Sequence, residues 1–530
     1  MSAALADLKE NKTQKGLEQR HIQLLALGGC IGTGLFVGSG SALSTCGPAA
    51  LLISYMIMSF FVWSVMQQIT EMVTWLPLPG RSTMSYLAAR YCDDSLSFCV
   101  GWNYYYAFSM IAPAEVSAAA FVIQYWSSLN VAVWISIMLV LMLALNFAPV
   151  KYFGESEFWI ATIKLFAVTG LIIVGIVIFF GGAPKSDGVL GFHYWKHPGA
   201  YVEHLADGNT GKFLACWTAI IKSGFSFVLS PELITTAILE SKNPRYSLPK
   251  ASNRFIYRLM FFYIGGTLTI GVICASNDSR LMSAIDSGSS SAAASPFVIG
   301  IQNFGIPVLN HIINACILTS AFSCGNSFIY SSSRILYSMA LEGKHAPRFF
   351  AKTNRHGVPY IAVIIGGGWI SLAYLEVSDS SSVVFTWLSN IATISGFFGW
   401  IFSSIIYLRF RKAMIFHGTY DKNPFKANLQ PYCAYLTLGF FSILALTNGY
   451  AVFIKGNWST SDFFAAYVTV GFVFVLYFGH KLYTRNWKRW YIPVEEIDVF
   501  TGLDEVEAEA ASYKRRDPKN IIEKFWFWLV

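Results

Sequence analysis

Continuous apolar runs of about 20 residues recur along almost the whole chain, separated by short polar connections. Each run is long enough to cross the roughly 30 Å hydrocarbon core of a bilayer as a helix. Backbone groups in lipid must bond internally, so helices are the expected solution. We therefore expect an all-α polytopic membrane protein. Its twelve predicted transmembrane spans are 22–46, 49–76, 98–126, 131–149, 157–181, 214–238, 255–275, 306–338, 360–376, 382–408, 432–454 and 462–483.

Basic residues are divided unevenly between the two sets of connections. With the N-terminus inside, the inner tail and loops carry most of the Lys and Arg residues. The outer loops carry only Lys185, Lys196, Lys212, Arg280 and Lys455. The positive-inside rule therefore places both termini in the cytoplasm. This predicts a cytoplasmic N-terminal tail at 1–20, a twelve-helix domain at 21–484 and a cytoplasmic C-terminal tail at 485–530.

Composition agrees with a membrane protein and excludes several classes. Hydrophobic residues make up 54% of the chain and charged residues 13%, whereas soluble domains carry about 25% charged residues. The net charge of +8 is scattered between apolar runs, which argues against nucleic-acid binding. The nine Cys form no CxxC pair, and hydrolase and nucleotide-binding motifs are absent. We therefore expect no enzyme activity, no metal and no cofactor.

Two predicted spans, five helices apart, contain helix-breaking residues at matching positions. The first span carries GGCIGTG over 28–34, and the sixth carries FSFVLSPE over 225–232. Glycine loosens the backbone, and proline removes a helical donor. Paired breaks of this kind mark the substrate site of inverted-repeat transporters, although the glycines would also suit close helix packing. We expect a five-plus-five inverted repeat of the LeuT type, with helices 1 and 6 unwound at mid-membrane, plus two further helices.

Unwound helices suit a zwitterionic amino acid, because their ends expose N–H groups and carbonyls with opposite partial charges. A substrate carboxylate would bind N–H groups near Gly32, Thr33 and Gly34. Its ammonium would bind carbonyls around Ile31 and Phe225. The rings of Phe225 and Phe227 could close over the substrate as a gate, and Ser226 and Ser230, which flank the break, are further candidate substrate-binding residues.

Ionisable residues within spans are costly and usually functional. Glu115 lies deepest, and we expect it to take part in transport. Glu71 could instead anchor the interface, and Glu232 could merely satisfy the broken helix. Lys164 could pair structurally, or its ammonium could stand where a related transporter binds sodium, which favours proton coupling. The candidates for coupling or gating are Glu71, Glu115, Lys164, Lys222 and Glu232.

The chain resembles fungal amino acid permeases of the amino acid–polyamine–organocation superfamily. The resemblance rests on GGCIGTG at 28–34, GESEFWIATIK at 154–164 and the stretches 320–334, 387–400 and 478–503. Within the family, AIIKSGFSF at 219–227 is most similar to the proline permease subgroup. The resemblance implies proton-driven uptake of a neutral amino acid at the plasma membrane, most simply L-proline. It also implies binding roles for Gly32, Thr33, Gly34 and Phe225. Glu115, Lys164 and Thr393 map to family positions as well.

The sequence leaves the substrate and the mode of transport open. Ser230 stands where the family usually has Gly, so alanine, GABA or other small amino acids remain candidate substrates. An exchanger or facilitator would keep the fold, and a nutrient receptor would bind without net flux. Asn277 and Asn457 begin glycosylation sequons in predicted outer loops. Lys9, Lys12 and Lys15 are candidate ubiquitin acceptors. Trafficking and ubiquitin-ligase adaptors are candidate partners of the cytoplasmic tails.

Overall fold

The computed structural model describes most of the chain. The described residues are 21, 31–77, 83–186, 188–239, 243–286, 295–306, 308–343, 345–377, 381–487, 489–512 and 520. The predicted ubiquitin acceptors Lys9, Lys12 and Lys15 lie outside them, as do Gly28, Gly29 and Cys30 of the first glycine-rich stretch.

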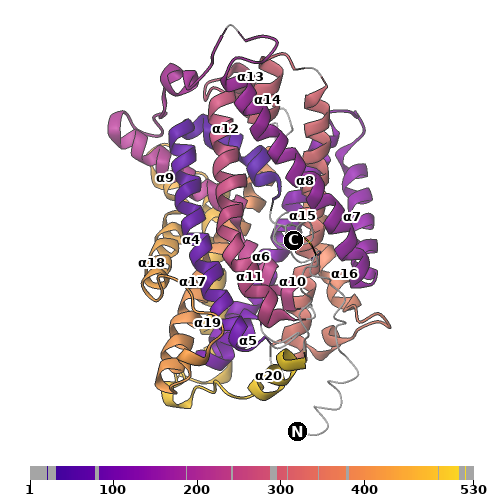
Figure 1. The fold of residues 1–530 in the computed structure, drawn as a ribbon, viewed down its shortest axis with the longest axis vertical. Helices are drawn as coiled ribbons and strands as arrows, with labels where there is room; N and C mark the ends of the chain where they lie inside the picture. The colour runs from indigo at the N-terminus through magenta and orange to yellow at the C-terminus, as the bar shows by residue number, and fades with distance from the viewer. Residues whose placement is uncertain are drawn as a thin grey trace.

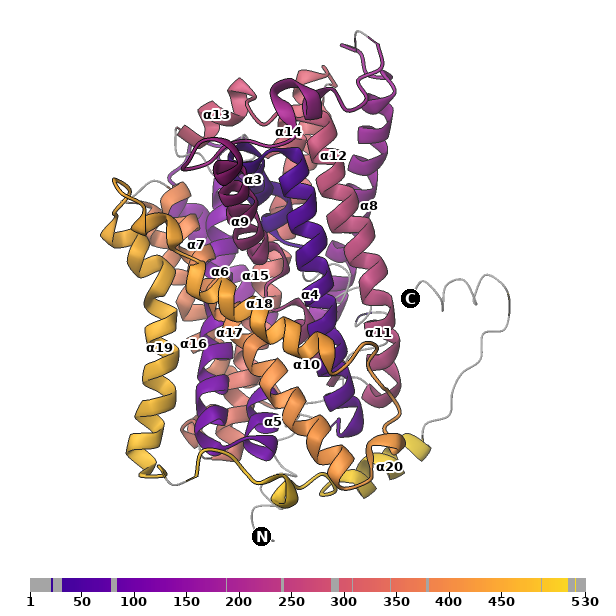
Figure 2. The ribbon, with the colours of Figure 1, turned by 90° about the vertical axis from the view of Figure 1, so that its left-hand side faces the viewer.

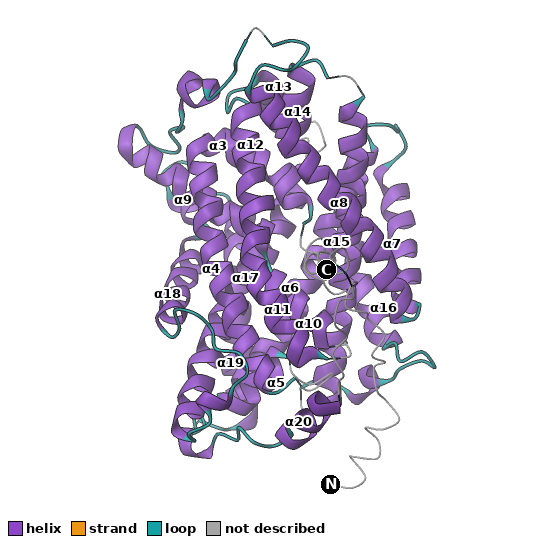
Figure 3. Cartoon of the chain, viewed as in Figure 1, coloured by secondary structure: helices purple, strands orange, loops and turns teal. Residues whose placement is uncertain are grey.

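Throughout the described part, the chain consists of helices joined by loops, without strands (Figure 3). The α-helices are α3 Ser39–Cys46, α4 Pro48–Trp75, α5 Met84–Tyr91, α6 Asp94–Ile123, α7 Val131–Phe147, α8 Val150–Phe179, α9 Gly208–Phe227, α10 Ser230–Leu239, α11 Pro244–Arg258, α12 Gly265–Ile273, α13 Ser279–Asp286, α14 Pro296–Asn303, α15 Leu309–Glu342, α16 Tyr360–Gly368, α17 Ser381–Phe416, α18 Tyr432–Thr447, α19 Thr460–Thr484 and α20 Leu503–Ser512. Short π-helical segments extend or join the α-helices at η1 Gly34–Gly38, η2 Trp195–Gly199 and η3 Leu259–Ile264. Segments of 3-10 helix do so at η5 Arg348–Ala351, η6 Trp369–Val377, η7 Tyr420–Lys422, η8 Tyr450–Phe453 and η9 Val494–Glu496.

These helices confirm the predicted polytopic fold. Eight described helical stretches are long and apolar enough to cross a membrane, and the shorter α7 and α18 are also apolar. The 30-residue α6 and the η1–α3 segment account for the third and first spans. Every predicted span therefore falls on helical structure, although the first is described only from residue 31.

Most of the helices run along the long axis of the molecule (Figures 1 and 2). At its centre α6 packs against α15 and α17. The short α13 and α14 lie at one end, and α5 and α20 at the other. We call these the α13 end and the α5 end. The two helices predicted to break, η1–α3 and α9–α10, contact each other through α9.

After α19 the chain turns back across the α5 end. Trp75 Nε1 donates to the Val499 carbonyl at 2.9 Å, and Arg90 Nε donates to the Asp498 carbonyl at 2.5 Å. The side chains of Ile497 and Val499 are buried against the helices. The first part of the tail is thus packed onto the helical domain.

Candidate functional site

The sixth span is broken over two residues. Helix α9 ends at Phe227, and α10 begins at Ser230. Between them Leu229 adopts a φ of 55°, which a helix does not tolerate. Pro231 falls in the first turn of α10, where its missing N–H costs no helical hydrogen bond. The Ser230 hydroxyl donates to the Phe227 carbonyl at 2.8 Å and so satisfies one group freed by the break.

The first span is also irregular. Ile31 and Gly32 are non-helical, and a π-helical turn follows over Gly34–Gly38. The Ile31 carbonyl accepts a hydrogen bond from the Ser320 hydroxyl of α15 at 2.7 Å. The two broken segments touch, because a Cβ added to Gly34 would lie 2.8 Å from the Ser226 Cα. The glycine-rich stretch and the Ser-Pro pair thus mark two breaks that face each other.

Glu115 of α6 reaches the first break. The Thr33 N–H donates to both Glu115 carboxylate oxygens, each at 3.2 Å. The carboxylate is buried, with 2% of the residue exposed. The backbone N–H that the sequence assigns to a substrate carboxylate is therefore bound by a carboxylate of the protein itself.

Two cavities meet at the breaks. The smaller has a volume of about 10 Å³ and is lined by Gly32, Gly34, Ile111, Glu115, Phe225, Ser226, Val228, Cys324 and Phe328. The larger has a volume of about 190 Å³ and is lined by Gly34, Val37, Gly38, Ser41, Ile221, Lys222, Phe225, Ile285, Phe385, Thr386, Ser389, Asn390 and Thr393. The larger cavity lies toward the α13 end, since Ile285 belongs to α13. Gly34 and Phe225 line both cavities, and the Phe225 ring meets Phe385 edge-on at 5.6 Å.

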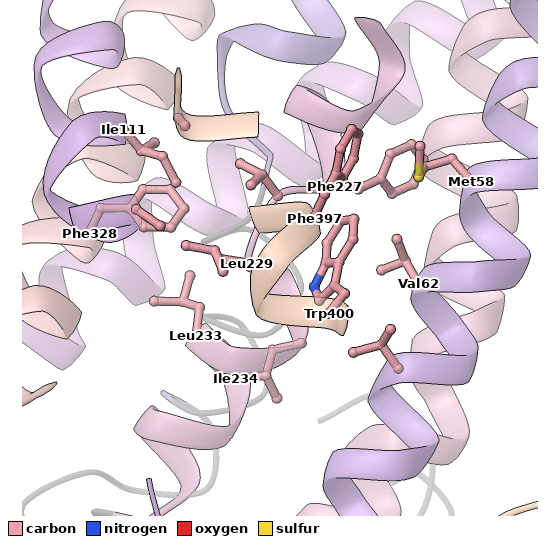
Figure 4. Close-up of a cluster of buried hydrophobic side chains, with 14 of the residues drawn as sticks. Met58, Val62, Ile111, Phe227, Leu229, Leu233, Ile234, Phe328, Phe397 and Trp400 are labelled. Carbon is pink, nitrogen blue, oxygen red and sulfur yellow. The ribbon is translucent and has the colours of Figure 1, made fainter. Parts of the chain in front are cut away.

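The two phenylalanines predicted to form a gate point in different directions. Phe227 lies on the α4 side, near Met58, whereas Ile111 and Phe328 lie across the break (Figure 4). Its ring centroid is 4.4 Å from Tyr263 and 5.4 Å from Tyr55. Phe225 alone of the pair therefore stands at the cavities.

The two serines of the break are both engaged. Ser226 lines the smaller cavity, and its hydroxyl lies 2.7 Å from the Tyr55 hydroxyl. Neither cavity is lined by Ser230. In this conformation Ser230 contributes to the helix break and does not form a cavity wall.

Lys164 of α8 lies among buried carboxylates. Its ammonium interacts electrostatically with Glu115 and with Glu157, and all three residues are buried. Glu157 also accepts a hydrogen bond from the Ser323 hydroxyl at 2.7 Å. The lysine thus links the site carboxylate to a second carboxylate two helical turns away on α8.

The larger cavity holds the predicted polar residues Lys222 and Thr393. The Lys222 ammonium donates to Ser41 Oγ at 2.9 Å and to Thr45 Oγ1 at 3.2 Å. The Thr393 hydroxyl donates to the carbonyl of Ser389 at 2.6 Å. The hydrogen of the Thr393 hydroxyl is thus engaged within its own helix.

Glu232 lies on the other side of the break, in the first turn of α10. Tyr104 of α6 donates to its Oε1 at 3.0 Å, and Trp400 of α17 donates to its Oε2 at 3.4 Å. Glu232 thereby ties the broken helix to two central helices, away from the larger cavity.

Glu71 lies apart from the other predicted residues, near the α17–α18 connection. Tyr407 and the Ala427 N–H donate to its Oε2 at 2.9 and 2.8 Å, and Arg411 lies 3.9 Å from Oε1. The carboxylate is fully buried. These contacts fit the anchoring interpretation of Glu71.

We predict that Glu71→Gln destabilises the protein and leaves its substrate affinity intact. Hydrogen bonds to a charged group contribute about 1.5–3 kcal/mol, so thermal unfolding of the purified variant should begin several degrees lower. The KM of the variant that reaches the membrane should match that of the unaltered protein. Normal thermal stability combined with lost accumulation would instead assign Glu71 to coupling.

Asn277 and Asn457 are both exposed, in the α12–α13 and η8–α19 connections. Their exposure is compatible with glycosylation, which stays a prediction.

Comparison with known proteins identifies the family. The family described as amino acid permease matches residues 21–493. The chain belongs to the amino acid permease family. Among curated permeases, the "Probable proline-specific permease put4" of Schizosaccharomyces pombe is 54% identical, over 95% of this chain and 90% of its own. Proline-specific permeases of Emericella nidulans and Saccharomyces cerevisiae are 50% and 49% identical, each over 98% of this chain and over 93% and 83% of their own.

The fold of this permease also recurs in solved structures. A manganese transporter of Eremococcus coleocola matches with a TM-score of 0.55 at 14% sequence identity, over 88% of this chain and 94% of its own. At that identity the similarity concerns the fold alone. It agrees with the expected inverted-repeat architecture.

Sequence reasoning missed several residues of the permease site. Glu157 lies seven residues before Lys164 on α8. Residues seven apart lie on one face of a helix, so this spacing could have indicated that the two side chains are neighbours. Cys324 and Phe328 line the smaller cavity from α15, and no local signal marks them. Tyr55 and Tyr104, the partners of Ser226 and Glu232, could be found only from the tertiary structure.

Proposed function

We propose that this permease takes up L-proline together with a proton across the plasma membrane, with both termini in the cytoplasm. The observation that carries the mechanism is the Glu115 carboxylate on the Thr33 N–H, at the meeting point of two broken helices. The names of the three similar permeases support proline as the substrate. The loop charges support the orientation, which makes the α13 end external.

Glu115 and the substrate carboxylate compete for one backbone donor. Two carboxylates sharing a site cannot both stay ionised without a large penalty. When Glu115 takes up a proton, its hold on the Thr33 N–H weakens and that donor becomes available. Substrate and proton therefore bind together, which is the requirement for symport.

The substrate ammonium is matched by backbone carbonyls at the same breaks. A carbonyl has two lone pairs, and the Ile31 carbonyl uses one for Ser320. The Phe225 carbonyl accepts a long bond of 3.4 Å from the Val228 N–H. A zwitterion can thus be held largely by main-chain groups.

Alternating access would use the break in the sixth span as a hinge. Phe225 separates the two cavities on the outer side, with Lys222 on the wall of the larger one. Glu232 holds α10 to Tyr104 and Trp400 on the inner side. Outward motion of Phe225 and release of Glu232 at different times would open the site to one side at a time.

Sodium should not be required for uptake. Lys164 supplies a fixed positive charge beside Glu115, where a cation would otherwise be needed. Replacing sodium with choline in the medium should leave initial proline uptake unchanged, and raising the medium from pH 5 to pH 7.5 should lower it. Uptake that requires sodium would contradict this role of Lys164.

Substrate choice can be tested by competition in cells that lack their own amino acid permeases. Labelled proline uptake should be blocked by unlabelled proline and much less by alanine, GABA, glutamate or lysine. Uptake of another amino acid in preference to proline would overturn the substrate but keep the fold. Release of labelled proline that requires an amino acid on the other side of the membrane would favour an exchanger. Binding of proline without transport would favour a receptor.

A further inference from the structure

A third cavity, of about 440 Å³, lies at the α5 end, between the ends of α6, α17 and α19 and the returning tail. It is separate from the transport site, because none of its lining residues lines either site cavity. We call it the α17–α19 groove. Its walls are mainly aromatic and aliphatic side chains, among them Phe402, Ile405, Val473, Phe474 and Phe478.

The groove opens sideways from the helical domain. Phe402 and Val473 are buried, with 6% and 7% of each residue exposed. Phe474 and Phe478 lie one turn apart on α19 and are 55% and 40% exposed. Their rings are parallel, with centroids 6.0 Å apart. A buried floor and an exposed aromatic edge on a membrane helix give a slot that faces lipid.

One end of the groove is polar, with Arg409 and Asp93 in its lining. Arg409 of α17 lines it, and its guanidinium donates to the carbonyls of Tyr91 and Ile492 and lies over the Tyr491 ring. Among the described residues no carboxylate pairs with Arg409. Lys481 differs in this respect, because Asp93 lies 2.9 Å from its ammonium. Arg409 thus leaves an uncompensated charge where the groove meets the membrane interface.

The last turn of α19 and the sequence after it carry further basic residues. In the sequence, four basic residues and four aromatic ones interleave over 481–491, at Lys481, Arg485, Lys488, Arg489, Tyr483, Trp487, Trp490 and Tyr491. Arg485 and Arg489 are exposed, and Arg489 pairs with Glu496. Aromatic residues gather at membrane interfaces, and basic clusters directly after a membrane helix attract anionic lipids.

We propose that the α17–α19 groove binds one anionic glycerophospholipid from the leaflet at the α5 end. An acyl chain lies between Phe402, Phe474 and Phe478. The headgroup phosphate lies against Arg409 and Arg485, because guanidinium groups bind phosphate oxygens in a forked geometry. The lipid would join α17, which carries Thr393, to α19 and the tail. This inference is independent of which amino acid is transported.

Native mass spectrometry of the full-length protein tests the proposal. The protein is purified in mild detergent with equal amounts of palmitoyl-oleoyl phosphatidylserine and phosphatidylcholine. We expect one phosphatidylserine to be retained in preference to phosphatidylcholine. In an Arg485→Gln/Arg489→Gln variant this preference should fall by about fivefold for each charge removed. A Lys352→Gln/Arg355→Gln variant removes the same charge from the exposed α15–α16 loop and should keep the preference.

Filling the groove provides a second test. Ile405→Trp places a larger side chain in the cavity and should lower retention of both lipids. Soluble glycerophosphoserine should not displace bound phosphatidylserine, because it has no acyl chain. Equal retention of the two lipids by the unaltered protein would overturn the proposal, as would an unchanged preference in the double arginine variant. The arginine variant decides the matter even where Ile405→Trp fails to fold.

Discussion

A Glu115→Gln variant is expected to reach the cell surface and to lose concentrative proline uptake. The amide introduced at this position would stay uncharged at every pH, so proline could meet the Thr33 N–H without a proton entering with it. Initial uptake should no longer rise when the medium is made acid, because proline binding no longer requires protonation of a carboxylate at this position. Labelled proline should then reach no higher a level inside the cell than outside.

The measurement is uptake per molecule of surface protein, with and without a protonophore. Glu203→Gln is the matched control, because Glu203 is exposed in the α8–α9 connection and the change in charge is the same. The control should accumulate proline normally. Accumulation by Glu115→Gln that still collapses with a protonophore would move the coupling group elsewhere, with Glu157 the first candidate.

Gly34→Ala is expected to abolish proline binding. The added Cβ would lie 2.8 Å from the Cα and the hydroxyl oxygen of Ser226, and the contact with backbone cannot be relieved by turning a side chain. The two broken helices would have to separate, which displaces Phe225 and the N–H groups at the site. Uptake should drop below detection, and proline should no longer raise the melting temperature of the purified protein.

The same helix offers a control for this substitution. Gly38 lies one turn further along, and a Cβ added there would meet nothing within 4 Å. Gly38 lines the larger cavity, but the added methyl group would meet no neighbour, so Gly38→Ala should keep proline affinity within about twofold. Normal affinity in Gly34→Ala would mean that proline binds away from the contact between the first and sixth spans.

The spans and the two breaks could be predicted from sequence because the bilayer and the backbone impose them. Helix length follows from membrane thickness, and the break at Val228–Leu229 follows from the Ser-Pro pair that starts α10. The positions of side chains around the breaks were harder to predict from sequence. Residues two apart on a helix point in opposite directions, so Phe225 and Phe227 could not both face one cavity.

Other features depend on contacts between distant parts of the chain. The Thr33–Glu115 bond joins residues 82 positions apart and requires α6 to pack behind the first break. Ser230 was assigned to the substrate because it stands beside the break, yet its hydroxyl bonds a carbonyl three residues earlier. Short-range bonds of this kind compete with ligand binding at helix ends, and sequence alone does not decide between them.

Proline uptake into proteoliposomes with an imposed pH gradient tests proton-coupled transport most directly. The purified permease is reconstituted, and labelled proline is added outside in sodium-free buffer. With the outside acid, proline should accumulate above its external concentration, and a protonophore should abolish the accumulation. Entry that stops at equal concentrations whatever the gradient, or that needs sodium, would contradict proton-coupled transport by this protein.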